Sequence, residues 1–157
     1  MVEGGADSHN AGWPVFIVHS LAHAVAALSA AQAAGRAVVL ASAADAGISA
    51  GPGWFKALID AARAAVPAAR FSAMLDCGDD AGAAQGAIRA GVDAVIFTGR
   101  ADVAERLQAI ARDRNCRVFT EWPQPAHDLL ALFFADGETV RRHCAEILAA
   151  PAGSSTP

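Results

Sequence analysis

The strongest constraint on the fold of this chain is the alternation of short apolar runs with stretches of helical periodicity. Each run has the length of a strand and lacks the apolar–polar alternation of a half-exposed sheet, as expected for strands that are covered on both faces. After the first run, for example, Leu21, Val25 and Leu28 share one face of a helix that ends at Gly35. The five runs are Val15–Val18, Ala37–Leu40, Phe71–Leu75, Ala94–Phe97 and Arg117–Phe119.

Strand–helix alternation with short connections favours a parallel sheet with right-handed crossovers. We therefore predict one α/β domain over residues 13–150, with a five-stranded parallel sheet and helices on both faces, open as in flavodoxin-like and Rossmann-like proteins. Two helices are expected to close the domain, the first carrying Leu129, Leu130 and Phe133 and the second Val140 and Cys144. Residues 1–12 and 151–157 are polar and turn-prone, which predicts a flexible leader and a flexible tail.

Composition narrows the classes of partner. The chain has 157 residues, of which 54% are hydrophobic, and this is enough to bury one core without disulfides or a structural metal. Its formal net charge of -4 argues against nucleic acid as a partner. It has no apolar run of the roughly 18 residues that a membrane span needs and no signal-peptide pattern at its start, so a cytoplasmic location is expected. Three widely spaced cysteines suit reduced thiols.

One segment of the chain resembles a known family. Residues 70–119, and above all the stretch Ala87–Gly99 with the sequence AIRAGVDAVIFTG, resemble consecutive units of (β/α)8 barrels of the aldolase and phosphate-binding kind. In those families a helix ending in AGAD or AGVD precedes an apolar strand, and a turn of small residues after the strand often holds phosphate. The resemblance implies that Thr98-Gly99 occupies that place.

The resemblance also raises an alternative fold, a partial (β/α) barrel. A complete barrel needs eight strands and typically ~250 residues, whereas five strands are found here. The open sheet is preferred because a half-closed barrel would leave apolar edges exposed. The Schiff-base lysine of a class I aldolase would have to be Lys56, which falls inside a predicted helix.

Ligands of open parallel sheets bind outside the carboxyl ends of the strands, and polar residues follow several of the predicted strands. The densest group is Asp76-Cys77-Gly78-Asp79-Asp80. Helix capping accounts for Asp79 or Asp80 without any ligand. This leaves Asp76 as a candidate general base, with Gly78 beside it.

His19 and Ser20 follow the first predicted strand, and His19 is the second acid–base candidate. His19 and His23 are four residues apart and could share a face, but no third metal ligand is near, so no metal site is predicted. A partly buried histidine hydrogen-bonded beside Ser20 is the simpler interpretation.

Thr98, Gly99 and Arg100 precede a helix, where backbone N–H groups and a guanidinium could receive an anion. A tight strand-to-helix turn requires a similar sequence, so both interpretations stay open. Ser42, at the start of a long glycine-rich connection, and Glu121, after the last predicted strand, are further candidates for ligand binding. The connection matches neither the Walker nor the dinucleotide-binding pattern, and no cofactor is assigned.

The leading functional hypothesis is binding of an anionic, phosphorylated metabolite at the carboxyl ends of the strands, with lyase or isomerase chemistry through Asp76 and His19. The alternative is a non-catalytic sensor or subunit-interaction module. The apolar stretch from Leu129 to Phe134 is wider than packing against one sheet needs. Burial between layers explains most of it, and the excess could serve self-association through the C-terminal helices.

Overall fold

The computed structural model describes residues 12–151, and its centre is a six-stranded sheet in which every strand pair is parallel. The strand order is β5-β4-β3-β2-β1-β6. The predicted parallel sheet is confirmed, but the predicted number of five strands is wrong because β6 adds a sixth beside β1. The strands are β1 (Val15–Ile17), β2 (Val38–Ala41), β3 (Phe71–Asp76), β4 (Ala94–Ile96), β5 (Arg117–Phe119) and β6 (Ala126–Asp128).

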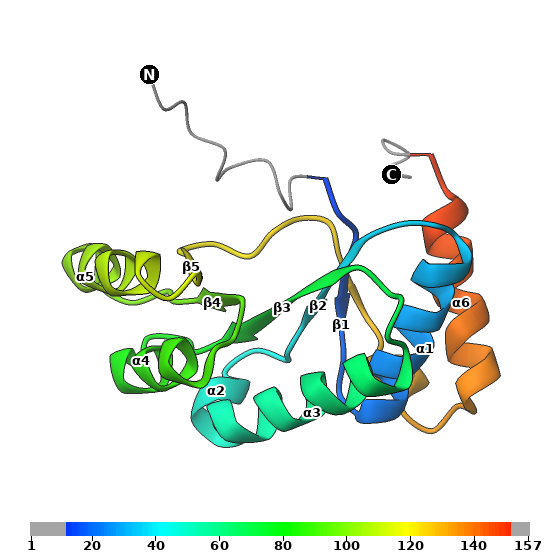
Figure 1. Cartoon of the computed structure of the whole chain (residues 1–157), viewed down its shortest axis with the longest axis horizontal. Coiled ribbons are helices and arrows are strands. Elements are labelled where there is room, and N and C mark those ends of the chain that lie inside the picture. The colour runs from blue at the N-terminus through cyan, green and yellow to red at the C-terminus, as the bar shows by residue number, and fades with distance from the viewer. Residues whose placement is uncertain (1–11, 152–157) are drawn as a thin grey trace.

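The helices cover only one face of this sheet (Figure 1). From β1 to β5 each strand lies next to the one before it, always on the same side, and right-handed crossovers then place every connecting helix on the same face. The predicted arrangement with helices on both faces is therefore wrong. The helices are α1 (Leu21–Ala33), α2 (Ala46–Ser49), α3 (Pro52–Ala65), α4 (Ala81–Ala90), α5 (Ala101–Arg112) and α6 (Gly137–Ala149).

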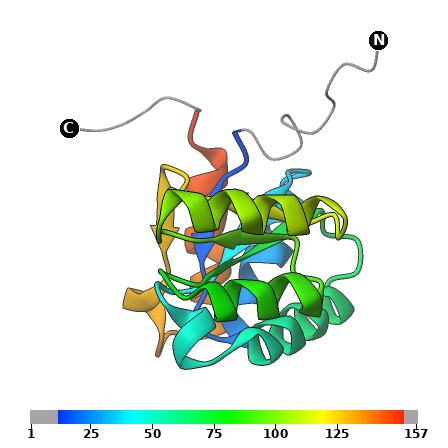
Figure 2. The same cartoon turned by 90° about the vertical axis from the view of Figure 1, so that its left-hand side faces the viewer.

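Side chains of successive strand residues point to opposite faces, so the sheet has two apolar clusters. The cluster on the helical face contains Phe16, Leu40 and Leu75 together with all the buried apolar side chains of the helices. Figure 2 shows α5 and α4 side by side over this face, with α3 beyond them. The cluster on the other face contains no helical residue.

That other face is covered by the segment of residues 120–125, which leads from β5 across the sheet to β6 (Figure 1, yellow). We call this segment the crossover. Trp122 of the crossover and Trp13 pack with Phe119 against the strand residues, chief among them Met74 and Ile96. In a closed barrel this face would line the interior, and here aromatic side chains fill it.

The residues after the crossover differ in secondary structure from the prediction. The first of the two predicted closing helices is wrong, because residues 126–128 form β6, in register with β1 from Val15 opposite Ala126. A single turn of 3-10 helix, η1 (Leu130–Leu132), follows, and only α6 is a full helix. Leu129 is fully buried, while Leu130 and Phe133 are exposed.

Local sequence signals fit the observed helix ends. Asp80 caps α4 by accepting a hydrogen bond from the Ala83 N–H, and Asp136 caps α6 in the same way through Thr139. Gly91 ends α4 with a φ of 83°, the left-handed conformation that glycine adopts without strain. The capped start of α4 lies directly after β3, at the carboxyl-terminal edge of the sheet.

The predicted leader and tail lie almost entirely outside the described residues. Within residues 12–151, no helix is both long enough and apolar enough to cross a membrane.

Candidate functional site

All six strands point the same way, so their carboxyl ends form one rim, as the sequence predicts for its five strands. The predicted site residues lie at or just after strand ends, and the structure separates all of them except Glu121 into three groups along this rim. One group surrounds Asp76 at the end of β3, another surrounds Thr98 at the end of β4, and the last contains His19 at the end of β1.

The carboxylate of Asp76 is buried, with a relative exposure of 3%, and every hydrogen bond it accepts comes from the chain itself. Oδ1 accepts from the backbone N–H groups of Asp45 (3.0 Å) and Gly78 (2.9 Å). Oδ2 accepts from the indole Nε1 of Trp122 at 2.7 Å. Asp76 thus ties the crossover and the loop after β2 to the end of β3, and its catalytic role stays a prediction that requires release of Trp122.

Ser42 and Gly78 serve the same local structure. The Ser42 hydroxyl accepts from the Asp76 N–H at 2.9 Å and donates to the Ala43 carbonyl. Gly78 has a φ of 52°, and its carbonyl accepts from the Thr98 N–H at 2.7 Å. A Cβ at Gly78 would collide with the Asp45 carboxylate. Both residues therefore hold neighbouring strand ends together, and ligand binding by them stays a prediction.

Cys77 lies next to Asp76 but is unsuited to thiolate chemistry. Burial, together with the negative charges of Asp76 and Asp80, raises the pKa of its thiol to about 12. Gly47 packs against its sulfur so closely that a Cβ there would overlap Sγ. Cys77 is a packing residue.

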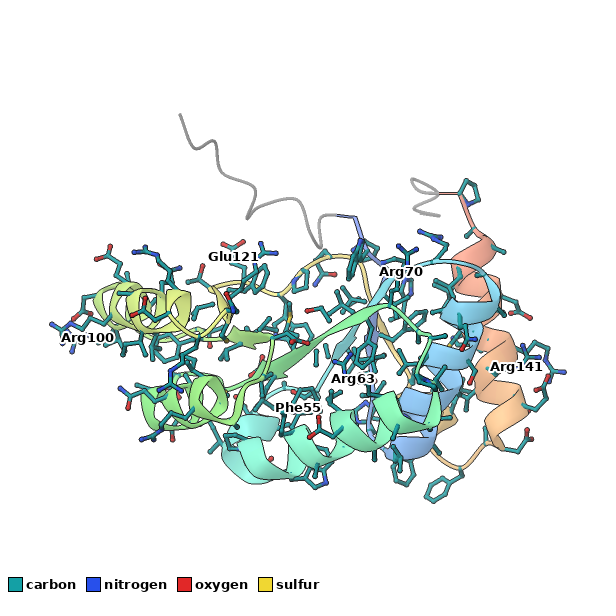
Figure 3. All side chains as sticks on the ribbon, in the orientation of Figure 1. Phe55, Arg63, Arg70, Arg100, Glu121 and Arg141 are labelled. Atoms are coloured by element: carbon teal, nitrogen blue, oxygen red, sulfur yellow. The ribbon has the colours of Figure 1, made fainter. Side chains whose placement is uncertain are left out.

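A surface depression of about 330 Å³ opens at the end of β4, lined by Phe97, Thr98, Gly99 and Arg100 together with Asp79, Ala81 and Val103. The depression lies where the first turns of α4 and α5 meet. Arg100 is 80% exposed and pairs with Asp102, through Nε at 3.0 Å and Nη2 at 2.9 Å. In Figure 3 its side chain projects outward at one end of the molecule. The predicted trio of Thr98, Gly99 and Arg100 does lie together.

The two helix starts at this depression differ. The Asp80 side chain occupies the Ala83 N–H of α4. Arg100 stands at the N-cap of α5 and makes no side-chain cap, so the first-turn N–H groups of α5 have no capping side chain. These donors carry the positive end of the α5 dipole.

At the other end of the rim, His19 Nε2 lies 2.6 Å from Oδ1 of Asp128, the last residue of β6. The side chain of His19 is 14% exposed and that of Asp128 is 51% exposed. Burial acts to raise the pKa of the Asp128 carboxyl, but hydrogen bonds from His19 and from the Leu130 N–H outweigh it, and the pKa lies below its ordinary value. Because an ionised carboxylate can only accept, His19 Nε2 is the donor of this hydrogen bond.

His23 lies behind this pair and is 1% exposed. Its Nδ1 accepts from the His19 N–H at 3.3 Å and its Nε2 faces the Leu132 carbonyl at 3.4 Å. Burial is the largest influence and lowers its pKa, while the bond to Leu132 opposes the shift. The hydroxyl of Ser20 caps α1 by accepting from the His23 backbone N–H, so His23 is a buried histidine next to this cap.

Among residues 12–151 no three His, Cys, Asp or Glu side chains are grouped to hold a metal ion. Glu121 is exposed and, in Figure 3, points away from the body of the molecule, so the structure does not bring it to Asp76 or Arg100.

Two residues of the rim were missed from the sequence. Trp122 packs against the apolar cluster on the face without helices, and its indole N–H binds Asp76. Asp128 was hidden in a segment predicted as helical. The only sequence signal for either was the stiff Trp-Pro-Gln-Pro stretch at residues 122–125, which is incompatible with a helix that continues through it.

No protein-family model matches this chain, and neither does any curated protein. Among solved structures, it is similar to the crystal structure of a protein from Coccidioides immitis named as a candidate fructose-1,6-biphosphate aldolase. The two superpose over 68% of this chain with a TM-score of 0.56 and 17% sequence identity. The match covers 39% of the other chain, so this chain spans well under half of that protein. The predicted partial resemblance to aldolase-type barrel proteins is confirmed, as a likeness of fold.

Proposed function

We propose that this protein binds a small anionic, phosphorylated metabolite in the depression at the end of β4. The observation that carries this proposal is the meeting of the uncapped start of α5 with the exposed Arg100 guanidinium at the edge of one depression. Free backbone N–H groups at a helix start and a guanidinium are the donors that phosphate oxygens prefer. The fold neighbour named as a fructose-1,6-biphosphate aldolase supports this class of ligand.

The carboxylates near Arg100 limit the expected affinity for an anion. Asp102 holds Arg100 in an exposed ion pair, which costs only about 0–1 kcal/mol to displace. Asp79 also lines the depression and repels an anion. One guanidinium and one helix start against this repulsion correspond to weak binding, with a dissociation constant of roughly 1 mM.

The proposed function is binding without cleavage of the ligand. His19 lies three strand spacings from the end of β4, about 14 Å at ~4.8 Å per strand. Asp76 is nearer, but Trp122 and two backbone N–H groups occupy its carboxylate. A ligand held at Thr98 and Gly99 therefore meets no available general base from the predicted pair.

Titration of the ¹⁵N-labelled protein with inorganic phosphate and with fructose 1,6-bisphosphate, followed by NMR, tests the proposal. We expect amide shifts at Thr98, Gly99 and the first turn of α5. The variant Arg100→Ala should bind at least about tenfold more weakly, because a charge-assisted hydrogen bond contributes roughly 1.5–3 kcal/mol. The variant Asp79→Asn should bind more tightly.

Arg114→Ala is the matched control, since this exposed arginine lies beyond the other end of α5. It removes the same charge from the chain and should leave the affinity unchanged. Shifts confined to other regions, or an Arg114→Ala effect as large as that of Arg100→Ala, would show that the anion responds to net charge and not to this depression.

A further inference from the structure

The segment after β6 exposes aromatic and aliphatic side chains that the fold does not bury. Leu130 is 56% exposed, Phe133 46% and Phe134 98%. We call these three residues the apolar knob. Phe134 is the most exposed of the three, and within residues 12–151 its only ring contact is edge-to-face with Phe133, at 5.2 Å between centroids. Leaving a phenylalanine in water forgoes about 1.5–3 kcal/mol of burial energy, so a chain that presents one fully exposed gains stability from any surface that covers it.

A groove that can accept such a side chain lies on the same side of the molecule. It has a volume of about 520 Å³ and runs between α1 and α6. Its α1 wall is Leu21, Ala22, Val25, Ala26 and Ser29, and its α6 wall is Gly137, Glu138 and Arg141. The small residues Ala22, Ala26 and Gly137 leave the space open. Figure 3 shows Arg141 pointing outward from α6, away from α1.

The knob and the groove are neighbours in the chain and in space. Phe134 lies three residues before Gly137, which lines the groove. Phe133 contacts the ring of His23 on α1 at 5.9 Å. Leu21 lines the groove and is itself 43% exposed. One continuous surface thus carries both a protruding aromatic residue and a hollow between helices.

We propose that two copies of this chain associate about a two-fold axis, with Phe134 of each copy inserted into the α1–α6 groove of the other. A surface with both knob and groove is complementary to itself, which is the condition for a closed, isologous dimer. The knob is aromatic and free of charge, since residues 129–135 include no charged side chain. Interface cores have this composition.

The charges around the knob disfavour a membrane as its partner. Asp128 and Asp136 bracket the uncharged stretch, and the first basic residue after it, Arg141, is paired with Glu138 at 2.6 Å. Surfaces that insert into lipid headgroups carry lysine and arginine beside their aromatic residues. Two acids beside the knob repel an anionic bilayer.

The available area fits a dimer of moderate affinity. The three knob residues and Leu21 expose on the order of 400 Å² of apolar surface, taking 150–250 Å² for a whole aromatic side chain. A standard interface buries about 800 Å² on each partner, so these four side chains alone supply about half of that area. We expect a dissociation constant in the micromolar range.

Sedimentation velocity of the full chain, from low micromolar to near-millimolar concentration, tests this. The wild type should shift from its chain mass of 16.0 kDa toward twice that value. Phe134→Glu, at the knob, and Ala22→Arg, in the groove, should each raise the dissociation constant at least about thirtyfold, as expected for a central interface residue. Both positions are exposed, so the fold should survive. Ile110→Glu on α5, 45% exposed and outside this surface, is the control and should leave the dimer intact.

A mixture of the two variants is decisive. In a mixed dimer the intact Phe134 of the Ala22→Arg chain meets the intact groove of the Phe134→Glu chain, and the second contact sets the new glutamate against the new arginine. The mixture should therefore associate more tightly than either variant alone. A wild type that stays monomeric throughout, a dimer that tolerates Phe134→Glu, or variants that fail to rescue each other would overturn the proposal.

Discussion

The hydrogen bond from Trp122 to Asp76 should be the most costly single contact to remove from the rim. Asp76 is 3% exposed, and the Nε1–Oδ2 distance of 2.7 Å is that of a strong, charge-assisted bond. Trp122→Phe keeps an aromatic ring but removes the donor. A hydrogen bond to a charged group contributes about 1.5–3 kcal/mol. A domain of this size loses about 2–4 °C in melting temperature per kcal/mol, so we expect a drop of roughly 3–12 °C.

Trp13→Phe is the matched control for lost packing. Trp13 and Trp122 are both half-buried and pack against the same apolar cluster, but Trp13 makes no side-chain hydrogen bond within the described residues. Trp13→Phe should therefore report the packing loss alone. The difference between the two variants, measured by urea denaturation followed by far-UV circular dichroism, isolates the hydrogen bond.

A double-mutant cycle with Asp76→Asn sharpens the measurement. In Asp76→Asn an amide can still accept at Oδ1 from the N–H groups of Asp45 and Gly78, but its NH₂ group would face the indole N–H of Trp122. Once Trp122→Phe has removed that opposing donor, Asp76→Asn should cost less than it does in the wild type. We expect a coupling free energy of at least about 1 kcal/mol. The two tryptophan variants could instead lose the same free energy of unfolding, with a coupling free energy within about 0.5 kcal/mol of zero. That result would refute a stabilising hydrogen bond from Trp122 to Asp76.

Three further outcomes follow from the structure. Burial lowers the pKa values of both His23 and His127 in the folded chain, so the unfolded chain binds protons more readily and stability should fall as the pH drops below about 6.5. In urea titrations across that range, His23→Gln should remove part of this slope. The exposed control His143→Gln should keep most of it, because His143 is only the smaller cause of the shift at His127. Gly78→Ala should cost about 1–3 kcal/mol, part of it recovered by adding Asp45→Ala, as checked by thermal melts; no recovery would exclude the collision with Asp45. With its thiol pKa near 12, Cys77 should resist iodoacetamide at pH 8 until the chain unfolds, as checked by mass spectrometry; rapid native labelling would contradict its burial.

The repeated strand–helix units were predictable because each carries its own signals. β2 is a run of apolar residues with all four buried, and α4 has its cap at Asp80 and its stop at Gly91 within the same short stretch. Such signals act over a few residues and need no knowledge of the rest of the chain. The parallel direction of the first five strands followed from them.

The sixth strand was missed because its structure comes from tertiary contacts. Ala126-His127-Asp128 contains none of the residues typical of strands, namely Val, Ile, Thr, Tyr, Phe and Trp, and none of the three is fully buried. These residues form a strand because the crossover delivers them to the free edge of β1, where Val15 to Ile17 offer unpaired backbone groups. The apolar residues that follow gave a helical pattern that ends after one turn.

The placement of helices could not be derived from the pattern of the strands alone. Apolar runs without alternation predict that both faces are covered, and this is true here. The pattern cannot distinguish a covering helix from an extended segment with a tryptophan. Met74 and Ile96 are as buried as the strand residues on the helical face, although the part of the chain that the structure describes covers them with the crossover and Trp13 and with no helix.

The crossover also determines where chemistry can take place on the rim. By bringing β6 to β1 it creates the His19–Asp128 pair from residues 109 positions apart. By placing Trp122 on Asp76 it occupies the carboxylate at the centre of the rim. The accessible polar groups are thus left at the two ends, with Arg100 at one and His19 at the other. A ligand bound at one end cannot reach the other, so joint action of Asp76 and His19 on a ligand at Thr98 requires that the crossover move and release Asp76.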